Sequence, residues 1–213
     1  MITFITNYDE STACNYNIYE RFEITPNISL LSNDATRENL TLNITASKQH
    51  VFAMSHGTEN HLSAQHGDIA ISEDNIINFS GVNFFSYACN TSISLGRFAS
   101  DSGCTWFGYT VPINPPEPDE QLCEIYKDLF HFIIKNYQNV SCRIGAINFI
   151  NELKTLCDEK IDILDNMSNN DDYLPGISAY QSIKQSWESI SVWLANDQDP
   201  IRHSEAPQPI LRW

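Results

Sequence analysis

The chain has 213 residues, of which 42% are apolar, so it is long enough for one sizeable core and has the composition of a folded protein. Its net charge of −15, with only 12 Lys and Arg, excludes nucleic acid and anionic membranes as expected partners, since both attract concentrated positive charge. A basic peptide or protein is the better electrostatic match.

The charge and hydropathy pattern of the sequence does not indicate a targeting or membrane segment. The N-terminus lacks a basic and then apolar leader, and no stretch approaches the roughly 18 apolar residues that a membrane span needs. We therefore expect a cytoplasmic protein. The six cysteines include no CxxC pair, so we predict free, mostly buried thiols, with no zinc ribbon, no other metal site and no cofactor.

The first half of the chain reads as short strands with one helix between them. β-Branched and aromatic residues predict a core strand over 2–6, and a weaker strand signal covers 19–24. A helix is predicted over 34–42. The unalternating apolar run at 50–54, which leads into Ser-His-Gly, is typical of a buried parallel strand. The runs GDIAI and IINFS then predict a hairpin over 67–80.

The next segment has the pattern of a βαβ unit, with core strands over 82–89 and 104–111. The helix between them is predicted to be capped by Asn90 or Thr91. Further helices are predicted over 119–137, 144–156 and 179–194. This order indicates a single α/β domain spanning 1–213, with 140–213 forming C-terminal helices or an appended subdomain.

Two chemically useful residues end neighbouring core strands of this predicted sheet. His56 ends the strand over 50–54, and Cys89 ends the strand that follows. Functional groups gather at the carboxyl ends of parallel strands, so we expect both at one edge. His56 would act as the base that a cysteine nucleophile needs, and a helix start after Cys89 would add positive potential. Gly57, without a side chain, would let its N–H and that of Cys89 bind an oxyanion.

Other interpretations of these residues stay open at this point. A strand-end His and a buried free Cys are common packing residues, and their catalytic role does not follow from position alone. His61 and His66 continue a five-residue spacing from His56, and these histidines with Asp68 could be imagined as metal ligands. Their spacing places them on no common helix face and lacks an HExxH pattern, which favours a solvated loop.

The order FAMSHG, hairpin, FFSYACNT, helix and CTWFGYTVPI resembles the clan CD cysteine proteases (caspases, gingipains and separase), most closely the bacterial CHAT domains. The resemblance covers about residues 50–137. It implies a caspase-like three-layer α/β sandwich with a mostly parallel central sheet flanked by helices. It also implies that His56 is the general base, Cys89 the nucleophile and Gly57 the oxyanion donor.

The resemblance implies a cysteine endopeptidase that cleaves a protein partner in a bacterial regulatory or defence setting. In this clan a pocket reads the residue before the scissile bond. Asp9 and Glu10 follow the first core strand, so they are candidates for an acidic pocket that takes a basic P1 residue. CHAT domains often accompany helical repeats, for which this chain has no room. Control would come from a separate regulatory protein, which is the expected partner, from the terminal segments, or not at all. A non-catalytic pseudoprotease that binds a partner and a Cys-His acyltransferase are the alternatives.

Overall fold

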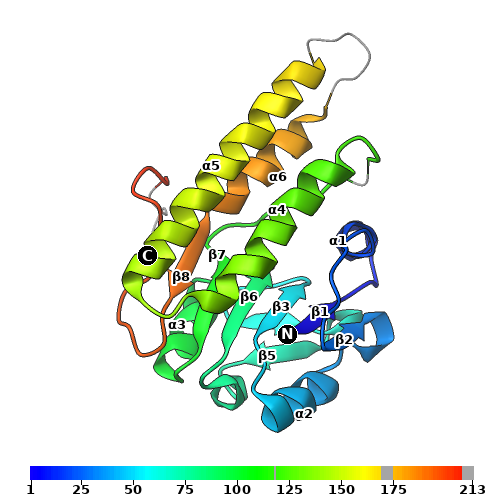
Figure 1. The fold of residues 1–213 in the computed structure, drawn as a ribbon. Helices are drawn as coiled ribbons and strands as arrows, with labels where there is room; N and C mark the ends of the chain where they lie inside the picture. The colour runs from blue at the N-terminus through cyan, green and yellow to red at the C-terminus, as the bar shows by residue number, and fades with distance from the viewer. Residues whose placement is uncertain (118, 169–174, 208–213) are drawn as a thin grey trace.

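A computed structural model of the chain describes residues 1–117, 119–168 and 175–207. A six-stranded sheet runs through the molecule in the order β2, β1, β3, β6, β7 and β8 (Figure 1). Only β7 and β8 pair antiparallel, whereas the other four neighbouring pairs are parallel. The strands are β1 (Ile2–Ile5), β2 (Ile28–Leu31), β3 (Val51–Met54), β6 (Asn83–Tyr87), β7 (Thr105–Tyr109) and β8 (Ile190–Trp193).

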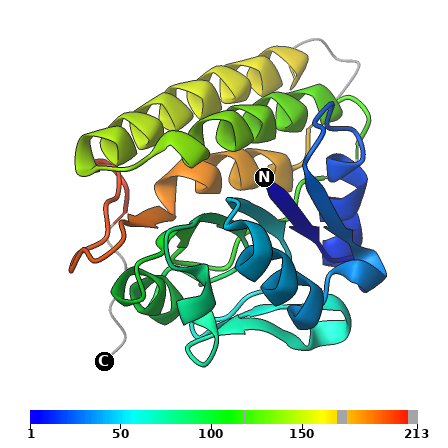
Figure 2. The same ribbon diagram turned by 60° about the horizontal axis from the view of Figure 1, so that its bottom comes forward.

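Helices cover both faces of this sheet, as Figure 2 shows. The helix α1 (Glu10–Tyr19), α4 (Cys123–Asn136), α5 (Arg143–Ser168) and α6 (Ile177–Glu188) share one core with the sheet. The opposite core contains α2 (Arg37–Ser47) and α3 (Ser94–Asp101), together with the small antiparallel pair of β4 (His61–Ser63) and β5 (Ile69–Ser72). The predicted α/β class, with a mostly parallel sheet flanked by helices, is confirmed.

The two cores follow from the period of two along each strand. In β6, Phe84 packs on the side of α2 and α3, and Phe85 packs on the side of α4. In β7, Trp106 and Phe107 divide in the same way. Phe84 stacks on Trp106 with ring centroids 4.5 Å apart, and aromatic pairs of this kind contribute about 0.5–1.5 kcal/mol beyond the area that they bury.

The C-terminal part of the chain completes the sheet. The prediction of a helix over 179–194 was therefore wrong at its C-terminal end. The helix α6 ends at Glu188, and after its C-cap Ser189 the residues Ile190–Trp193 form the edge strand β8. Alternation explains the change, because Ile190 and Val192 enter the core below α6 while Trp193 enters the opposite core. Val192 also forms a β-bridge with Ile201, so the following segment covers the edge of the sheet.

Three other local predictions were wrong. The weak strand over 19–24 is not formed; the helix α1 occupies 10–19 instead. The predicted second hairpin strand is a 3₁₀ turn over Ile76–Phe79, whose first and last side chains are buried, and β5 pairs with β4. Neither Asn90 nor Thr91 caps α3. Asn90 has a positive φ of 59° inside a turn, and α3 begins at Ser94.

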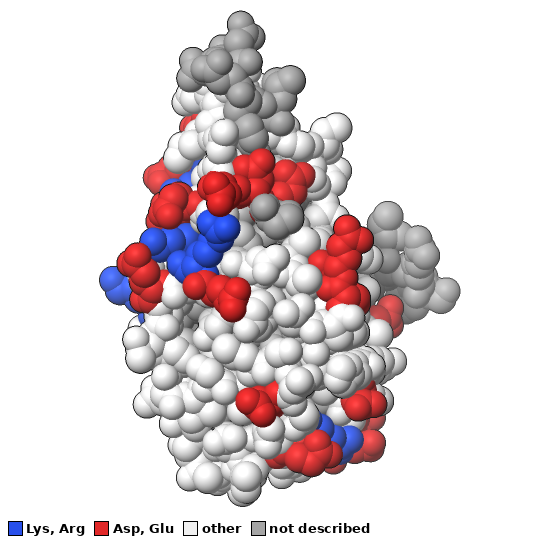
Figure 3. All heavy atoms as spheres, turned by 90° about the vertical axis from the view of Figure 1, so that its right-hand side faces the viewer, with Lys and Arg blue, Asp and Glu red and all other residues white. Residues whose placement is uncertain are grey.

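The charged surface is predominantly acidic. On the face shown in Figure 3, acidic groups are spread over a mostly uncharged surface, and the larger basic cluster is bordered by acidic groups. Lys127, for example, lies 3.2 Å from Glu23 and 3.8 Å from Glu124. Exposed pairs of this kind contribute at most about 1 kcal/mol to stability, so their main effect is to neutralise the few basic groups. Among the described helices, none is long and apolar enough to cross a membrane.

Candidate active site

The register of the sheet brings His56 and Cys89 to one edge. In the parallel pair of β3 and β6, Met54 is opposite Tyr87. His56 and Cys89 each lie two residues beyond this pair, at the carboxyl ends of their strands. The predicted common edge is therefore confirmed, while the catalytic roles of the two residues stay predictions.

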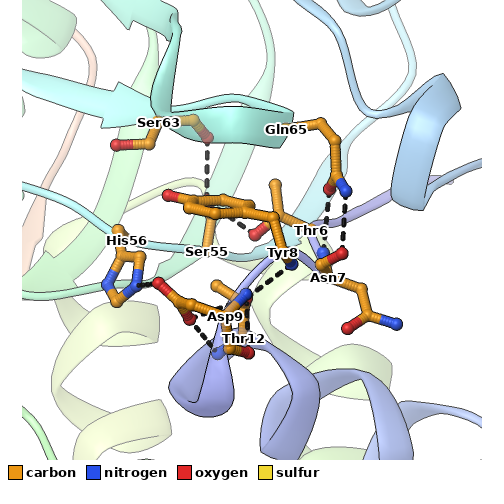
Figure 4. A network of polar contacts seen from close by, with 9 residues as sticks. All are labelled: Thr6, Asn7, Tyr8, Asp9, Thr12, Ser55, His56, Ser63 and Gln65. Atoms are coloured by element: carbon orange, nitrogen blue, oxygen red, sulfur yellow. Dashed lines mark hydrogen bonds and ion pairs between the residues drawn. The ribbon is translucent and has the colours of Figure 1, made fainter.

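A third residue reaches this edge from β1. Asp9 follows β1 and is the N-cap of α1, and its Oδ2 lies 2.6 Å from Nε2 of His56 (Figure 4). Its Oδ1 accepts hydrogen bonds from the N–H and the hydroxyl of Thr12, both at 2.9 Å. Burial by itself raises the pKa of the Asp9 carboxyl, but the hydrogen bonds from Thr12 and His56 outweigh it and lower the pKa below its ordinary value.

The contact between Asp9 and His56 leaves one ring nitrogen free. Among the described residues, Nδ1 of His56 has no hydrogen-bond partner. The ring of Tyr8 packs edge-on against the imidazole, with centroids 5.7 Å apart at 66°. Asp9 and Tyr8 thus fix the orientation of His56, and Nδ1 is the nitrogen that can accept a proton.

The thiol of Cys89 lies against the loop that follows β7. Its Sγ is 3.4 Å from the amide nitrogen of Ile113 and 3.8 Å from the carbonyl oxygen of the same residue. Cys89 is partly buried, and no hydrogen bond joins it to His56 in the described part of the chain. The two residues share an edge, and the thiol is engaged with backbone rather than with the imidazole.

Side chains from α6 hold this loop in place. Gln185 accepts a hydrogen bond from the Asn114 N–H at 2.9 Å, and Gln181 accepts one from the Asn114 amide at 2.8 Å. The Tyr87 hydroxyl donates to the carbonyl of Asn114 at 3.0 Å. These contacts could not be predicted from the sequence, because no local motif links α6 to a loop about seventy residues earlier.

Gly57 packs against the turn that carries Cys89. A Cβ at this position would lie 2.4 Å from Cγ2 of Thr91, 2.8 Å from the carbonyl oxygen of Cys89 and 3.0 Å from Cβ of Ala88. No other residue type fits without displacing this backbone. Among the described residues, neither the Gly57 N–H nor the Cys89 N–H has an acceptor. Two adjacent free donors are what an oxyanion requires.

The remaining predicted or considered site residues lie outside this constellation. Glu10 is exposed in the first turn of α1 and has no ion-pair partner in the described ranges. His61 contacts Thr58 through Nδ1 at 3.0 Å, and His66 is exposed. Within the described residues, no group of three or more His, Cys, Asp and Glu is arranged to hold a metal ion.

The six cysteines are free and differ in their environments. Cys142 is exposed and Cys89 is partly buried. Burial raises the thiol pKa of the other four, Cys14, Cys104, Cys123 and Cys157. Because the thiolate is the reactive form, these four are expected to react slowly at neutral pH, and Cys142 is the competitor that a labelling experiment must remove.

Comparison with protein-family models, curated proteins and solved structures found no match. The comparisons assign no family. The likeness to clan CD proteases therefore stays a prediction made from the motifs of the sequence.

Proposed function

We propose that the protein is a cysteine endopeptidase in which Cys89 is the nucleophile, His56 the general base and Asp9 the residue that orients His56. The observation that carries this proposal is the convergence of three strand ends, those of β1, β3 and β6, with the Asp9–His56 contact at 2.6 Å beside the turn of Cys89. The free N–H groups of Gly57 and Cys89 support it, because they supply the donors that the reaction needs.

The proposed reaction has two halves, acylation of Cys89 and hydrolysis of the resulting thioester, and His56 acts as the base in each. Nδ1 of His56 removes the thiol proton, and Sγ of Cys89 attacks the scissile carbonyl carbon. The N–H groups of Gly57 and Cys89 donate to the oxyanion. Collapse breaks the C–N bond, and the imidazolium returns its proton to the leaving amine. Water, deprotonated by His56, then hydrolyses the thioester, which releases the carboxylic acid and restores the thiol.

For this reaction, the thiol must leave its contact with the Ile113 backbone and turn to His56. A substrate or a regulatory protein that displaces the loop around Ile113 would supply that change. We propose a protein substrate, a regulatory protein partner and a bacterial regulatory or defence setting in the cytoplasm, on the basis of the sequence resemblance.

A basic P1 residue remains the proposed preference, and Glu10 is now its main candidate determinant. Both oxygens of Asp9 are already used by Thr12 and His56, so Asp9 has little capacity left for a substrate cation. The net charge of −15 also favours a basic substrate segment. Glu10→Gln should slow labelling by an arginyl acyloxymethyl ketone and leave labelling by a neutral leucyl analogue unchanged.

The test of the enzyme proposal is selective covalent labelling of Cys89. A Cys142→Ser background removes the exposed competing thiol. In this background we expect one adduct from an arginyl or lysyl acyloxymethyl ketone by intact mass. Cys89→Ala and His56→Ala should abolish the adduct, whereas His61→Ala, a histidine in the same loop region, should retain it.

A second candidate function is a non-catalytic interaction module with the same fold. The specific observation in its favour is the engagement of the Cys89 thiol with Ile113 and not with His56. If Cys89 is alkylated no faster than the buried Cys104, even by a small reagent, the enzyme proposal fails and this candidate replaces it. An acyltransferase would pass the same labelling test, and it differs in giving an amide or ester product with an added nucleophile.

A further inference from the structure

A buried glutamine outside the proposed catalytic set contacts the loop that carries Asp9. Gln65 is 5% exposed and follows β4 in the turn toward β5. Its Oε1 accepts a hydrogen bond from the Asn7 N–H at 2.9 Å, and its Nε2 donates to the Asn7 carbonyl at 2.7 Å (Figure 4). The side-chain amide thereby satisfies both backbone groups of a residue 58 positions earlier in the chain.

The glutamine is itself held in position. Its backbone N–H donates to the carbonyl of Ala35 at 2.9 Å, which ties the turn to the segment before α2. The Ala64 N–H donates to the carbonyl of Asp68 at 2.6 Å and closes the turn on the other side. Gln65 therefore acts from an anchored backbone, and its side chain can position a neighbouring loop.

The loop after β1 has little freedom once Asn7 is held. The N–H groups of Tyr8 and Asp9 both donate to Oγ1 of Thr12, at 2.9 and 3.0 Å. Together with Gln65, these contacts engage the backbone N–H groups of three consecutive residues that end at Asp9. The direction of the Asp9 side chain toward His56 follows from this arrangement.

A second chain of contacts joins the same segments. The Thr6 hydroxyl donates to Ser55 at 3.0 Å, and the Ser55 hydroxyl donates to the carbonyl of Ser63 at 2.8 Å (Figure 4). Thr6, Ser55 and Ser63 are buried. This relay connects the ends of β1 and β3 to β4, so it sets the spacing between the two loops, whereas Gln65 contacts the backbone two residues before Asp9.

We infer that Gln65 is a positioning residue for the proposed peptidase, which orients Asp9 and through it His56 by clamping the backbone of Asn7. The inference rests on the proposed function. The amide is specifically suited to this role, because it offers one acceptor and one donor in one plane, as a paired strand does. Leucine offers neither group, and glutamate keeps only the acceptor.

The first test compares the alkylation rates of Cys89 between variants of the full chain, all of which carry the Cys142→Ser substitution. Gln65→Leu should lower the second-order rate about tenfold or more, since a small misplacement of a catalytic group is enough for such a loss. The alkylation rate of Gln65→Glu should lie between the rates of wild type and Gln65→Leu. Gln138→Leu is the matched control, because Gln138 is partly buried and donates to Ile134, away from the site, and its rate should be unchanged.

A double-mutant cycle separates positioning from general damage. In an Asp9→Asn background, Gln65→Leu should cause no further loss, because the residue through which Gln65 acts has already been disabled. If the two losses multiply instead, Gln65 has a merely structural role and the inference is overturned. Should Gln65→Leu fail to fold, Gln65→Glu takes its place in the same cycle and is judged by the same criterion.

A measurement that does not depend on the reactivity of Cys89 tests the role of Gln65 separately from the proposed enzyme activity. In an NMR titration of the Asp9 carboxyl, Gln65→Leu should raise the pKa from its lowered value, because the hydrogen bond to His56 is misaligned. The charged or titratable side chains beside this carboxyl are those of His56 and Tyr8. An unchanged Asp9 pKa in folded Gln65→Leu would overturn the inference. A raised pKa with an unreactive Cys89 would support it while the proposed function fails.

Discussion

His56 and Cys89 end neighbouring strands of one sheet, yet different kinds of contact hold them. On the side of His56, polar side chains from three segments converge: the exposed Asp9 contacts the imidazole, and the buried Gln65 holds the loop that leads to Asp9. On the side of Cys89, the thiol touches the backbone of a single proline-rich loop that glutamines of α6 hold. The proposed base is thus held by a side-chain network, whereas the position of the proposed nucleophile depends on a loop.

This difference has a consequence for how the site can change. A network with several buried hydrogen bonds is costly to rearrange, because each buried group that loses its partner costs about 1–3 kcal/mol. Behind His56, the hydrogen bonds from Thr6 to Ser55 and from Ser55 to Ser63 are buried, although the contact of His56 with Asp9 is exposed. The loop at Ile113 is held by hydrogen bonds that are partly buried or exposed. Activation should therefore move the loop beside Cys89 and leave the buried hydrogen bonds behind His56 unchanged.

The largest effect is expected from a substitution of Gly57, which follows His56 and packs against the turn that carries Cys89. Gly57→Ala places a Cβ 2.4 Å from Thr91 and 2.8 Å from the Cys89 carbonyl oxygen. We expect overpacking to cost about 1–3 kcal/mol of unfolding free energy. Displacing one oxyanion donor should also slow peptide cleavage by roughly 10²–10³-fold. Both are measurable, by denaturant unfolding and by steady-state kinetics.

Gly145→Ala is the control for this prediction. Gly145 lies in α5, and an added Cβ would approach no atom closer than the 3.7 Å to Sγ of Cys142. Alanine in a helix should stabilise the protein by about 0.5–1 kcal/mol and leave cleavage unchanged. Full activity in Gly57→Ala would show that its N–H is not part of the site.

The next effect concerns the orientation of His56. Asp9→Asn keeps a good N-cap for α1 and removes the carboxylate from Nε2 of His56. Because proton transfer by a well-placed base contributes roughly 10²–10⁴-fold, we expect a loss of about tenfold to a hundredfold in kcat/KM with α1 intact. Circular dichroism checks the helix and cleavage of a peptide checks the rate. Wild-type kinetics in this variant would remove Asp9 from the mechanism.

A smaller effect, an increase in the labelling rate and not a loss of activity, is expected from a substitution beside Cys89. Gln185→Ala removes the acceptor for the Asn114 N–H and should loosen the loop that covers the thiol. Access to a partly buried thiol rises with local opening, so a small iodoacetamide should label Cys89 about two- to fivefold faster. Lys184→Ala, one residue earlier on α6 and paired with Glu188, serves as the control. An equal rate in all three proteins would mean that the loop does not shield Cys89.

The smallest effect is on stability in acid. The pKa of Asp9 is lower in the folded protein than its ordinary value, so its contribution to stability is present above the unfolded pKa of about 4. That contribution is lost as the pH falls through the lower folded value. The stability difference between wild type and Asp9→Asn should therefore be largest near neutral pH and shrink toward pH 3. Denaturant unfolding at several pH values measures it.

Regular burial patterns made part of the fold predictable. The unalternating runs that became β3, β6 and β7 could be recognised because strands buried on both faces of a parallel sheet are apolar throughout. The long helix α4 followed from its apolar spacing. The strand β8 was missed because Ile190–Trp193 begins one residue after the end of a helical segment, and only pairing with β7 makes it a strand.

Within the site, position along the chain was enough to predict a common edge for His56, Cys89 and Asp9. It was not enough to assign Asp9, which was predicted to line a substrate pocket and which contacts His56 at 2.6 Å. That role of the carboxylate depends on the register between β1 and β3 and on the cap of α1. Neither can be read from NYDE alone.

The sequence by itself determined the fold class and the strands that lead to His56 and Cys89. These depend on local patterns of hydrophobicity and backbone geometry, which short segments encode. Only the tertiary structure decided which partner each group has: Asp9 for His56, Ile113 for Cys89 and Gln65 for Asn7. Such pairs join residues 24 to 58 positions apart. Their formation depends on how strands and turns pack, which no single segment of the sequence encodes.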